Sequence, residues 1–399
     1  MIRKIFNIKM PKGYDKGIHA AIIFLNLFGL LMILSANMTS IATRKSLTII
    51  FVKEIAFIVA SYYIMVQAAR NFSFKAFGKH YMKILIGIMG LLFLTMAFPS
   101  VRGARAWIRI GKITIQPSEF AKVFVILLMA YFLGDKQKVS TKVKSMWKLA
   151  KTPIVIVLII VGFVTIAQKD LGSAVVIAGI TYVVMLVPSN LAMSKAQRVM
   201  FTLLVIGLIL MFWVTTPKGV AMIDKLPIPS YMIDRFRISA NPFTNRYDNG
   251  YYQIFNGIVA FVKGGLLGVG YGKGFIKYSY LPEAENDAIL AVVIEELGMI
   301  GFSFLLILYG IVIYRLLKMA FKVKFEKEKM VLVGTVAYIM IHFVFNVGGI
   351  TALIPLTGVP LLFISAGGSS RMAIMLAIGL SQSVISRHKA LEQKKVKHV

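Results

Sequence analysis

The sequence predicts an all-α polytopic membrane protein with about ten transmembrane helices, both termini in the cytoplasm and one large extracytoplasmic loop. Its 399 residues are 58% hydrophobic, and the mean hydropathy of +0.78 is typical of polytopic membrane proteins. Apolar stretches of roughly 17–25 residues, long enough to cross a bilayer, recur along the chain. These observations favour one integral membrane domain over residues 1–399, with no separate soluble module.

The apolar stretches define the expected spans in order. The basic N-terminus leads into a first stretch that is too long for the apolar core of a cleavable signal peptide, so the first helix is expected to stay. Only Gln168, Lys169 and Asp170 separate the fifth stretch from the sixth. The ten expected spans are residues 18–36, 47–67, 82–99, 117–134, 153–168, 171–187, 199–216, 287–314, 330–348 and 366–386.

The basic residues predict the orientation and the surroundings of the chain. The 46 Lys and Arg residues exceed the 16 acidic ones by 30, and the short segments rich in them place both termini in the cytoplasm. These cations border apolar helices rather than forming one soluble face, so anionic lipid head groups are the expected partner and nucleic acid is not. Cysteine is absent, which excludes disulfides and Cys-ligated metals.

Three segments between the spans carry distinct patterns. The large outer loop, residues 217–286, begins with Pro217, Pro227 and Pro229, which argue against a helix that runs through this stretch. It also contains an amphipathic stretch, 250–263, suited to the membrane surface, and then five glycines that allow close backbone packing or bends. Residues 100–116 form a second outer loop with four cations and one tryptophan. Residues 346–370 carry no charge and are rich in Gly and Pro, which predicts a broken or re-entrant helix protected by protein.

Acidic residues gather beside the eighth apolar stretch. A carboxylate where an aqueous loop meets a membrane helix is a candidate for chemistry, and Asp287 is the candidate general base. In the alternative interpretation, Asn286 or Asp287 caps the helix that follows, and the residues alone leave both open. We expect Glu283 and Glu285 to be loop charges or partners of the base, and Glu295 and Glu296 to be structural.

Several separated motifs resemble the SEDS family (RodA/FtsW/SpoVE) over nearly the whole chain. They are Gly103-Ala-Arg-Ala-Trp-Ile108 with Gln116-Pro-Ser-Glu-Phe-Ala-Lys122, Gln168-Lys-Asp-Leu-Gly-Ser173, Leu281-Pro-Glu-Ala-Glu-Asn-Asp287 with Glu295-Glu-Leu-Gly298, and the run from Leu356 to Ser370. Three positions depart from the pattern of the family: Lys169 replaces a proline, Ala288 an aromatic residue and Ala366 a tyrosine. These departures affect details of the substrate pocket.

The resemblance implies a peptidoglycan glycosyltransferase that polymerises lipid II outside the cytoplasmic membrane of a bacterium, together with a class B penicillin-binding transpeptidase. It also favours Asp287 as the base that deprotonates the acceptor hydroxyl. No cofactor is required, although a divalent cation between Asp287 and the diphosphate is conceivable. Division, elongation and sporulation members of the family share the motifs, so all three roles stay open.

Two other functions remain as alternatives. Charged residues within the spans would suit a flippase for lipid II. The chain shows no inverted repeat, however, and its reactive carboxylate and basic loops lie on one side, which disfavours a transporter. A non-catalytic scaffold for a transpeptidase is the second alternative, and it predicts that Asp287 is dispensable.

Cations of the outer loops are candidates to bind the diphosphate, because guanidinium groups match phosphate oxygens bidentately. Contact with lipid head groups is the alternative for each of them. Trp107 either stacks on a sugar or polyprenyl unit or anchors the loop at the membrane interface. The candidate cations are Arg102, Arg105, Arg109 and Arg246, with Arg235 and Arg237 as further ones.

Four charged residues in or beside the spans complete the candidate site. Glu119 and Lys122 lie three apart on a helix that Pro117 begins, so they form either a structural ion pair or a polar floor under the active site. Asp170 has the same two interpretations. Arg371 has no acidic neighbour in sequence and is expected to meet phosphate or Glu295/Glu296. His19 and His342 lack a second ligand at metal spacing, so a structural role is expected for both and no metal site is predicted.

Overall fold

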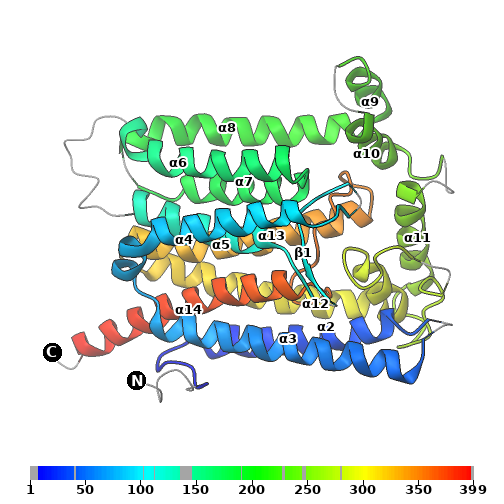
Figure 1. Cartoon of the computed structure of the whole chain (residues 1–399), viewed down its shortest axis with the longest axis horizontal. Helices are drawn as coiled ribbons and strands as arrows, with labels where there is room; N and C mark the ends of the chain where they lie inside the picture. The colour runs from blue at the N-terminus through cyan, green and yellow to red at the C-terminus, as the bar shows by residue number, and fades with distance from the viewer. Residues whose placement is uncertain are drawn as a thin grey trace.

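The long apolar stretches fold as long helices that lie side by side along the longest axis of the molecule (Figure 1). The computed structural model describes residues 8–39, 42–101, 103–111, 113–134, 146–189, 191–226, 230–244, 249–278 and 281–396. The long helices are α2 (Lys16–Ala36), α3 (Arg44–Asn71), α4 (Phe74–Leu94), α5 (Pro117–Leu133), α6 (Met146–Gly162), α7 (Leu171–Met185), α8 (Leu191–Val214), α12 (Ile289–Lys322), α13 (Glu326–Ile350) and α14 (Gly368–Val396).

Each of the ten predicted spans falls on one of these helices, which confirms the all-α membrane fold class. Among the described residues, seven helices are long and apolar enough to cross a membrane. The others are α5, the shorter α7 and α14, which runs ten residues beyond the predicted span. A π-helical turn, Phe163–Ala167, ends α6 before α7 begins at Leu171, so the fifth and sixth spans are separate helices.

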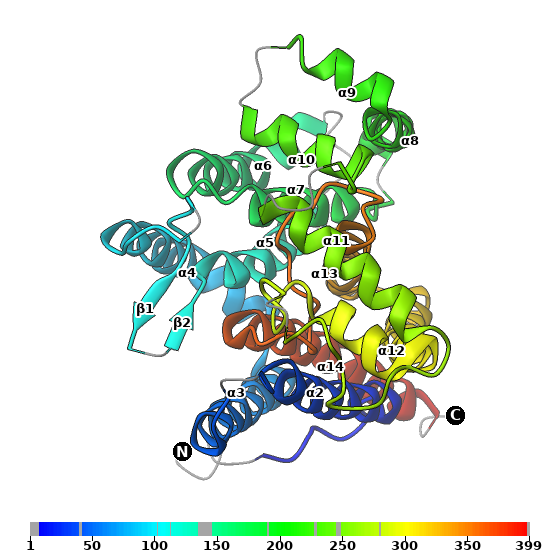
Figure 2. The same cartoon turned by 90° about the vertical axis from the view of Figure 1, so that its right-hand side faces the viewer.

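Short elements cover the end of the bundle opposite to the start of α2 (Figure 2). The 3-10 turn Thr95–Ala97 follows α4 directly. The loop after this turn contains an antiparallel hairpin of β1 (Ile108–Ile110) and β2 (Ile113–Ile115). The large outer loop contributes α9 (Pro217–Ile223), α10 (Ser230–Ala240) and α11 (Asn249–Gly264). The predicted amphipathic stretch is therefore helical. Pro217 occupies the first turn of α9, where its missing N–H costs nothing. This helix ends at Ile223, so it does not run on to Pro227 and Pro229, which lie outside the described residues.

The centre of the bundle is α5, which packs against α4, α6, α7, α13 and α14. Its side chains from Ala121 to Ala130 are all buried, as a helix that is apolar on every side requires. By contrast, α8 lies at the margin of the bundle and exposes every side chain from 201 to 210. This apolar surface suits contact with lipid.

A break at Gly298, whose φ and ψ of 64° and −164° are not helical, divides α12 into a short first part and a longer second part. Residues 264–278, here called the glycine loop, enter this break. The N–H groups of Val269 and Gly270 donate to the carbonyls of Glu295 and Glu296, both at 2.9 Å. At Gly264 a Cβ would lie 1.9 Å from the carbonyl oxygen of Ile294. The glycines therefore permit the close backbone packing that the sequence predicted.

Replacing Gly298 with alanine is expected to lower the free energy of unfolding by about 1–3 kcal/mol, because this backbone conformation is essentially restricted to glycine. Gly310→Ala is the matched control on the same helix. A Cβ at Gly310 would meet nothing within 4 Å, so this variant should gain about 0.5–1 kcal/mol. Thermal unfolding in detergent measures both, and equal midpoints for the two variants would contradict the break.

Residues 351–367, here called the crossover segment, join α13 to α14 without regular structure. The segment nevertheless passes through the protein, since Leu361, Leu362, Phe363 and Ile364 are each at most 1% exposed. Irregular backbone in such a position needs hydrogen-bond partners from the protein. The structure therefore agrees with the predicted break in helical structure after Asn346, and the side chains that bind this segment mark out the candidate site.

Candidate active site

Asp287 lies just before the first residue of α12 and is 8% exposed. The N-cap of α12 is Ala288, and among the described residues no side chain caps this helix end. The capping interpretation of Asn286 and Asp287 is therefore wrong. Gln253 of α11 donates a hydrogen bond from Nε2 to Asp287 Oδ1 at 3.2 Å, so the carboxylate is directed towards α11 rather than along its own helix.

Asn346 of α13 and Ser365 of the crossover segment hold the main chain at Asp287 and Asn286. Asn346 Nδ2 donates to the carbonyls of Asp287 and Val359, at 2.8 and 3.0 Å. A Cβ at the exposed Gly358 would lie 3.7 Å from Asp287 Oδ2. Further along, Ser365 Oγ donates to the carbonyl of Asn286 at 2.7 Å. The backbone around the candidate base is thus fixed by partners distant in sequence.

Asp170 lies on another side of the same segment. It caps α7, because its Oδ1 accepts from the N–H of Ser173 at 3.0 Å, while Oδ2 accepts from Gln116 Nε2 at 2.8 Å. A Cβ at Gly172, in the first turn of α7, would lie 2.7 Å from the carbonyl oxygen of Thr357. Asp170 therefore stabilises a helix end that packs directly on the crossover segment beside Gly358.

Glu119 and Lys122 form the predicted ion pair, with 2.7 Å between Oε1 and Nζ and both side chains 1% exposed. Tyr338 Oη donates to Glu119 Oε2 at 2.7 Å. Lys122 Nζ also donates to His342 Nε2 at 3.1 Å, and an ammonium group can only donate. His342 Nδ1 is therefore the protonated ring nitrogen, and it donates to the carbonyl of Pro360 at 3.0 Å. The pair is thus linked to the crossover segment.

Sequence reasoning missed Tyr338 and Asn346, and Gln253 beside the base. Tyr338, His342 and Asn346 lie four apart on α13, so they share one face of the helix, and this spacing was a readable signal. His342, for which a structural role was expected, bridges Lys122 and the backbone of Pro360. Gln253 had no comparable signal, because its contact with Asp287 depends on how α11 packs.

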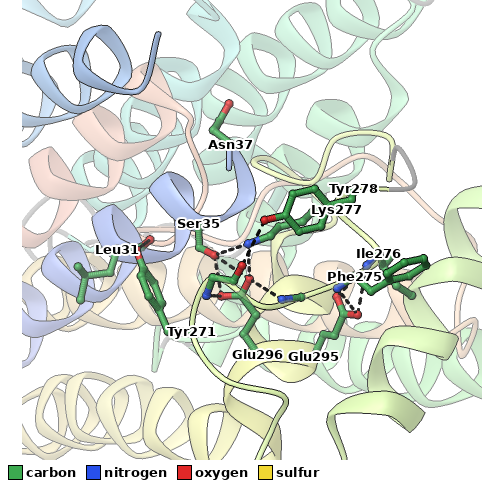
Figure 3. Close-up of polar contacts among 12 residues, drawn as sticks. Leu31, Ser35, Asn37, Tyr271, Phe275, Ile276, Lys277, Tyr278, Glu295 and Glu296 are labelled. Carbon is green, nitrogen blue, oxygen red and sulfur yellow. Dashed lines mark hydrogen bonds and ion pairs between the residues drawn. The ribbon is translucent and has the colours of Figure 1, made fainter. Parts of the chain in front are cut away.

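Arg371 pairs with Glu54 of α3, at 2.6 Å between NH1 and Oε2, and both side chains are at most 1% exposed. Its NH2 donates to the carbonyl of Ser365 at 3.2 Å. The expected partners Glu295 and Glu296 instead bind the glycine loop, in agreement with their expected structural role (Figure 3). Arg371 thus holds the end of the crossover segment nearest α14.

The outer cations fall into three groups. Arg105 and Arg109 are exposed on the hairpin loop, with Trp107 half-buried between them; the N–H of Arg105 donates to the carbonyl of Gln168 at 2.8 Å. On α10, Arg235 donates to the carbonyl of Leu356 at 2.9 Å, and Arg237 pairs with Asp224 and Asp234. The remaining candidates, Arg102 and Arg246, lie outside the described residues.

Within the part of the chain that the structure describes, no group of three or more His, Asp or Glu side chains could hold a metal ion. The divalent cation between Asp287 and the diphosphate stays a prediction.

Sequence comparison finds relatives along almost the entire chain. The model of a family described as "Cell cycle protein", comprising FtsW, RodA and SpoVE, matches residues 17–390. A probable peptidoglycan glycosyltransferase FtsW of Bacillus subtilis is 32% identical over 98% of this chain and 94% of its own length. Stage V sporulation protein E of the same organism is 32% identical over 76% of this chain and 78% of its own length.

Structure comparison finds the same fold. A chain of a peptidoglycan synthase complex, in a structure concerned with the coordination of polymerization and crosslinking, superposes with a TM-score of 0.71 at 22% identity. The match covers 96% of this chain and 99% of that one. The rod shape determining protein RodA of Thermus thermophilus gives a TM-score of 0.61 at 22% identity, over 94% and 97% of the two chains.

Proposed function

Because the chain belongs to the FtsW/RodA/SpoVE family of cell cycle proteins, we propose that it is a peptidoglycan glycosyltransferase that polymerises lipid II on the outer face of a bacterial cytoplasmic membrane. The names of its relatives support the reaction class. The observation that carries the assignment to a site is Asp287, a largely buried carboxylate at the end of α12 that caps no helix.

In the proposed reaction, Asp287 accepts the proton of the acceptor sugar hydroxyl as that oxygen attacks the anomeric carbon of the donor sugar. The new glycosidic bond forms while the bond from that carbon to the diphosphate breaks. The leaving group is polyprenyl diphosphate, which carries away the electron pair of the broken bond. A positioned general base contributes about 10²–10⁴-fold to such a step.

The cations of the outer loops are proposed to neutralise the diphosphate. The exposed side chains of Arg105 and Arg109 support this role, since guanidinium groups bind phosphate oxygens bidentately. Arg102 and Arg246 are proposed for the same role on sequence grounds, and Trp107 is proposed to stack on a sugar or polyprenyl unit. Glu119, Lys122, Asp170 and Arg371 are proposed to act indirectly, by fixing the crossover segment.

A class B penicillin-binding transpeptidase is the proposed partner. The fold relative that comes from a synthase complex coordinating polymerization and crosslinking supports such an assembly. Relatives named FtsW, stage V sporulation protein E and rod shape determining protein RodA share the sequence or the fold. We retain division or elongation as the cellular role.

Purified protein with its cognate transpeptidase should convert lipid II into long glycan strands, which gel electrophoresis of the products resolves. The same preparation in liposomes tests the flippase alternative, because externally added reagent then labels lipid II that has crossed the bilayer. Polymer without translocation supports the proposal. Translocation without polymer would replace the proposed reaction by transport.

A further inference from the structure

Gln253 places an amide group directly against the candidate base. The side chain is 6% exposed, and its Nε2 lies 3.2 Å from Asp287 Oδ1. The two residues belong to different elements: Gln253 lies in the second turn of α11, whereas Asp287 precedes α12. The contact therefore depends on how α11 is held against the part of α12 before the break at Gly298.

A second buried cluster joins the glycine loop, which follows α11, to α2 and α12. We call Ser35, Lys277 and Glu296 the clasp (Figure 3). Lys277 and Glu296 are 2.7 Å apart with both side chains 0% exposed, and Ser35 of α2 donates to Glu296 at 2.6 Å. A charge buried to this extent is stable only with a partner and hydrogen bonds, which the clasp supplies.

The clasp also holds the glycine loop that follows α11. The N–H groups of Gly272 and Gly274 donate to the Glu296 carboxylate at 2.9 and 3.3 Å. Beside it, the N–H groups of Phe275 and Ile276 donate to Glu295 at 2.9 and 3.1 Å. The loop is thus bound to two carboxylates of α12, immediately before the break at Gly298.

Contacts near both ends of α11 fix this helix against the first part of α12. Gly264, at the end of α11, packs on the carbonyl of Ile294, and Gln253, near its start, binds Asp287. A helix rises about 1.5 Å per residue, so sliding α11 by a single residue would break the contact between Gln253 and Asp287. The clasp lies where it prevents this movement.

We propose that α11 is a positioning helix: Gln253 orients the Asp287 carboxylate, and the clasp maintains the register on which that contact depends. This inference rests on the proposed function, in which Asp287 is the general base. Gln253, Lys277 and Glu296 are positioning residues, because they act through Asp287 and not on the substrate.

The first test replaces Gln253 with methionine, which keeps the length of the side chain and removes its donor. We expect kcat for glycan polymerisation to fall about ten-fold, with KM for lipid II unchanged within about twofold. Asn256→Ala is the matched control, since Asn256 lies on the same helix and its side chain donates to the carbonyl of Tyr252, one turn earlier on α11. A normal kcat in Gln253→Met, or an equal loss in Asn256→Ala, would overturn the proposal.

The second test asks whether the clasp acts through Gln253. Either single substitution would leave one buried charge without its partner and could prevent folding. The double variant Lys277→Met/Glu296→Gln removes both charges together and avoids this problem. This pair of changes should lower kcat in the wild-type background and have little further effect in Gln253→Met. Independent, multiplicative losses would show that the clasp does not set the position of Asp287.

Different results would contradict the proposed function and the positioning role of Gln253. If the wild-type protein does not polymerise lipid II, the proposed function is wrong. If the wild type polymerises, Asp287→Asn is inactive and Gln253→Met has a normal kcat, only the positioning role is wrong.

Discussion

Asp287→Asn is expected to lower the rate of glycan polymerisation by about 10²–10⁴-fold. Asparagine keeps the shape of the side chain and its place beside Gln253, but it cannot accept the proton of the attacking hydroxyl. Strand formation from purified lipid II, with the cognate transpeptidase present, measures the loss. Asp287→Ala should fail to the same extent, because the missing group is the same in both variants.

Asp234→Asn is the matched control for this prediction. Asp234 is an exposed carboxylate on α10, in the same outer loop, and it pairs with Arg237 at the surface. Its removal should leave polymerisation within about twofold, since exposed ion pairs contribute little. Both Asp287 variants must keep the unfolding midpoint and the transpeptidase complex of the wild type. Normal polymerisation by folded Asp287→Asn would move the base elsewhere and would favour the scaffold alternative.

Lys122→Met is expected to lower the free energy of unfolding by about 3–5 kcal/mol, because it leaves the Glu119 carboxylate buried without its cation. Tyr338 would remain as a hydrogen-bond donor to Glu119, but a hydroxyl does not neutralise the charge. His342 would also lose the donor that selects its tautomer. The midpoint of thermal unfolding in detergent measures the effect.

The double variant Lys122→Met/Glu119→Gln separates the two interpretations of this pair. With both charges removed, most of the lost stability should return. Polymerisation that returns with it identifies a structural ion pair, whereas a stable but inactive double variant identifies a polar floor of the active site. An unchanged unfolding midpoint in Lys122→Met alone would contradict the burial of the pair.

The parts of this molecule that could be predicted are those that depend on neighbours in sequence. Apolar stretches predicted the helices because the length and apolar composition of each stretch favour a membrane-spanning helix, whichever helices it packs against. The pair of Glu119 and Lys122 was predictable because side chains three apart on a helix are adjacent. Its connection to His342 was not, since Lys122 and His342 are 220 residues apart in the sequence.

The same distinction explains the incorrect expectations. Arg371 pairs with Glu54, more than 300 residues away, and nothing local favours Glu54 over the acidic cluster beside α12. Asp287 resembled a helix cap because its residue type suits one, yet α12 begins two residues later and tertiary contacts direct the carboxylate to Gln253. Packing between α11 and α12 decides that geometry, and a sequence pattern does not reveal it.

The crossover segment is bound mainly through its backbone, which affects how its sequence can diverge. Four of its carbonyl oxygens accept hydrogen bonds from side chains. Arg235 donates to Leu356 and Asn346 to Val359. His342 donates to Pro360 and Arg371 to Ser365. At Ala366, where relatives are expected to carry tyrosine, the bond to Glu285 is made by the main-chain N–H. Any residue except proline supplies that donor. Evolution can therefore exchange side chains along the segment while the donors around it maintain the same backbone path.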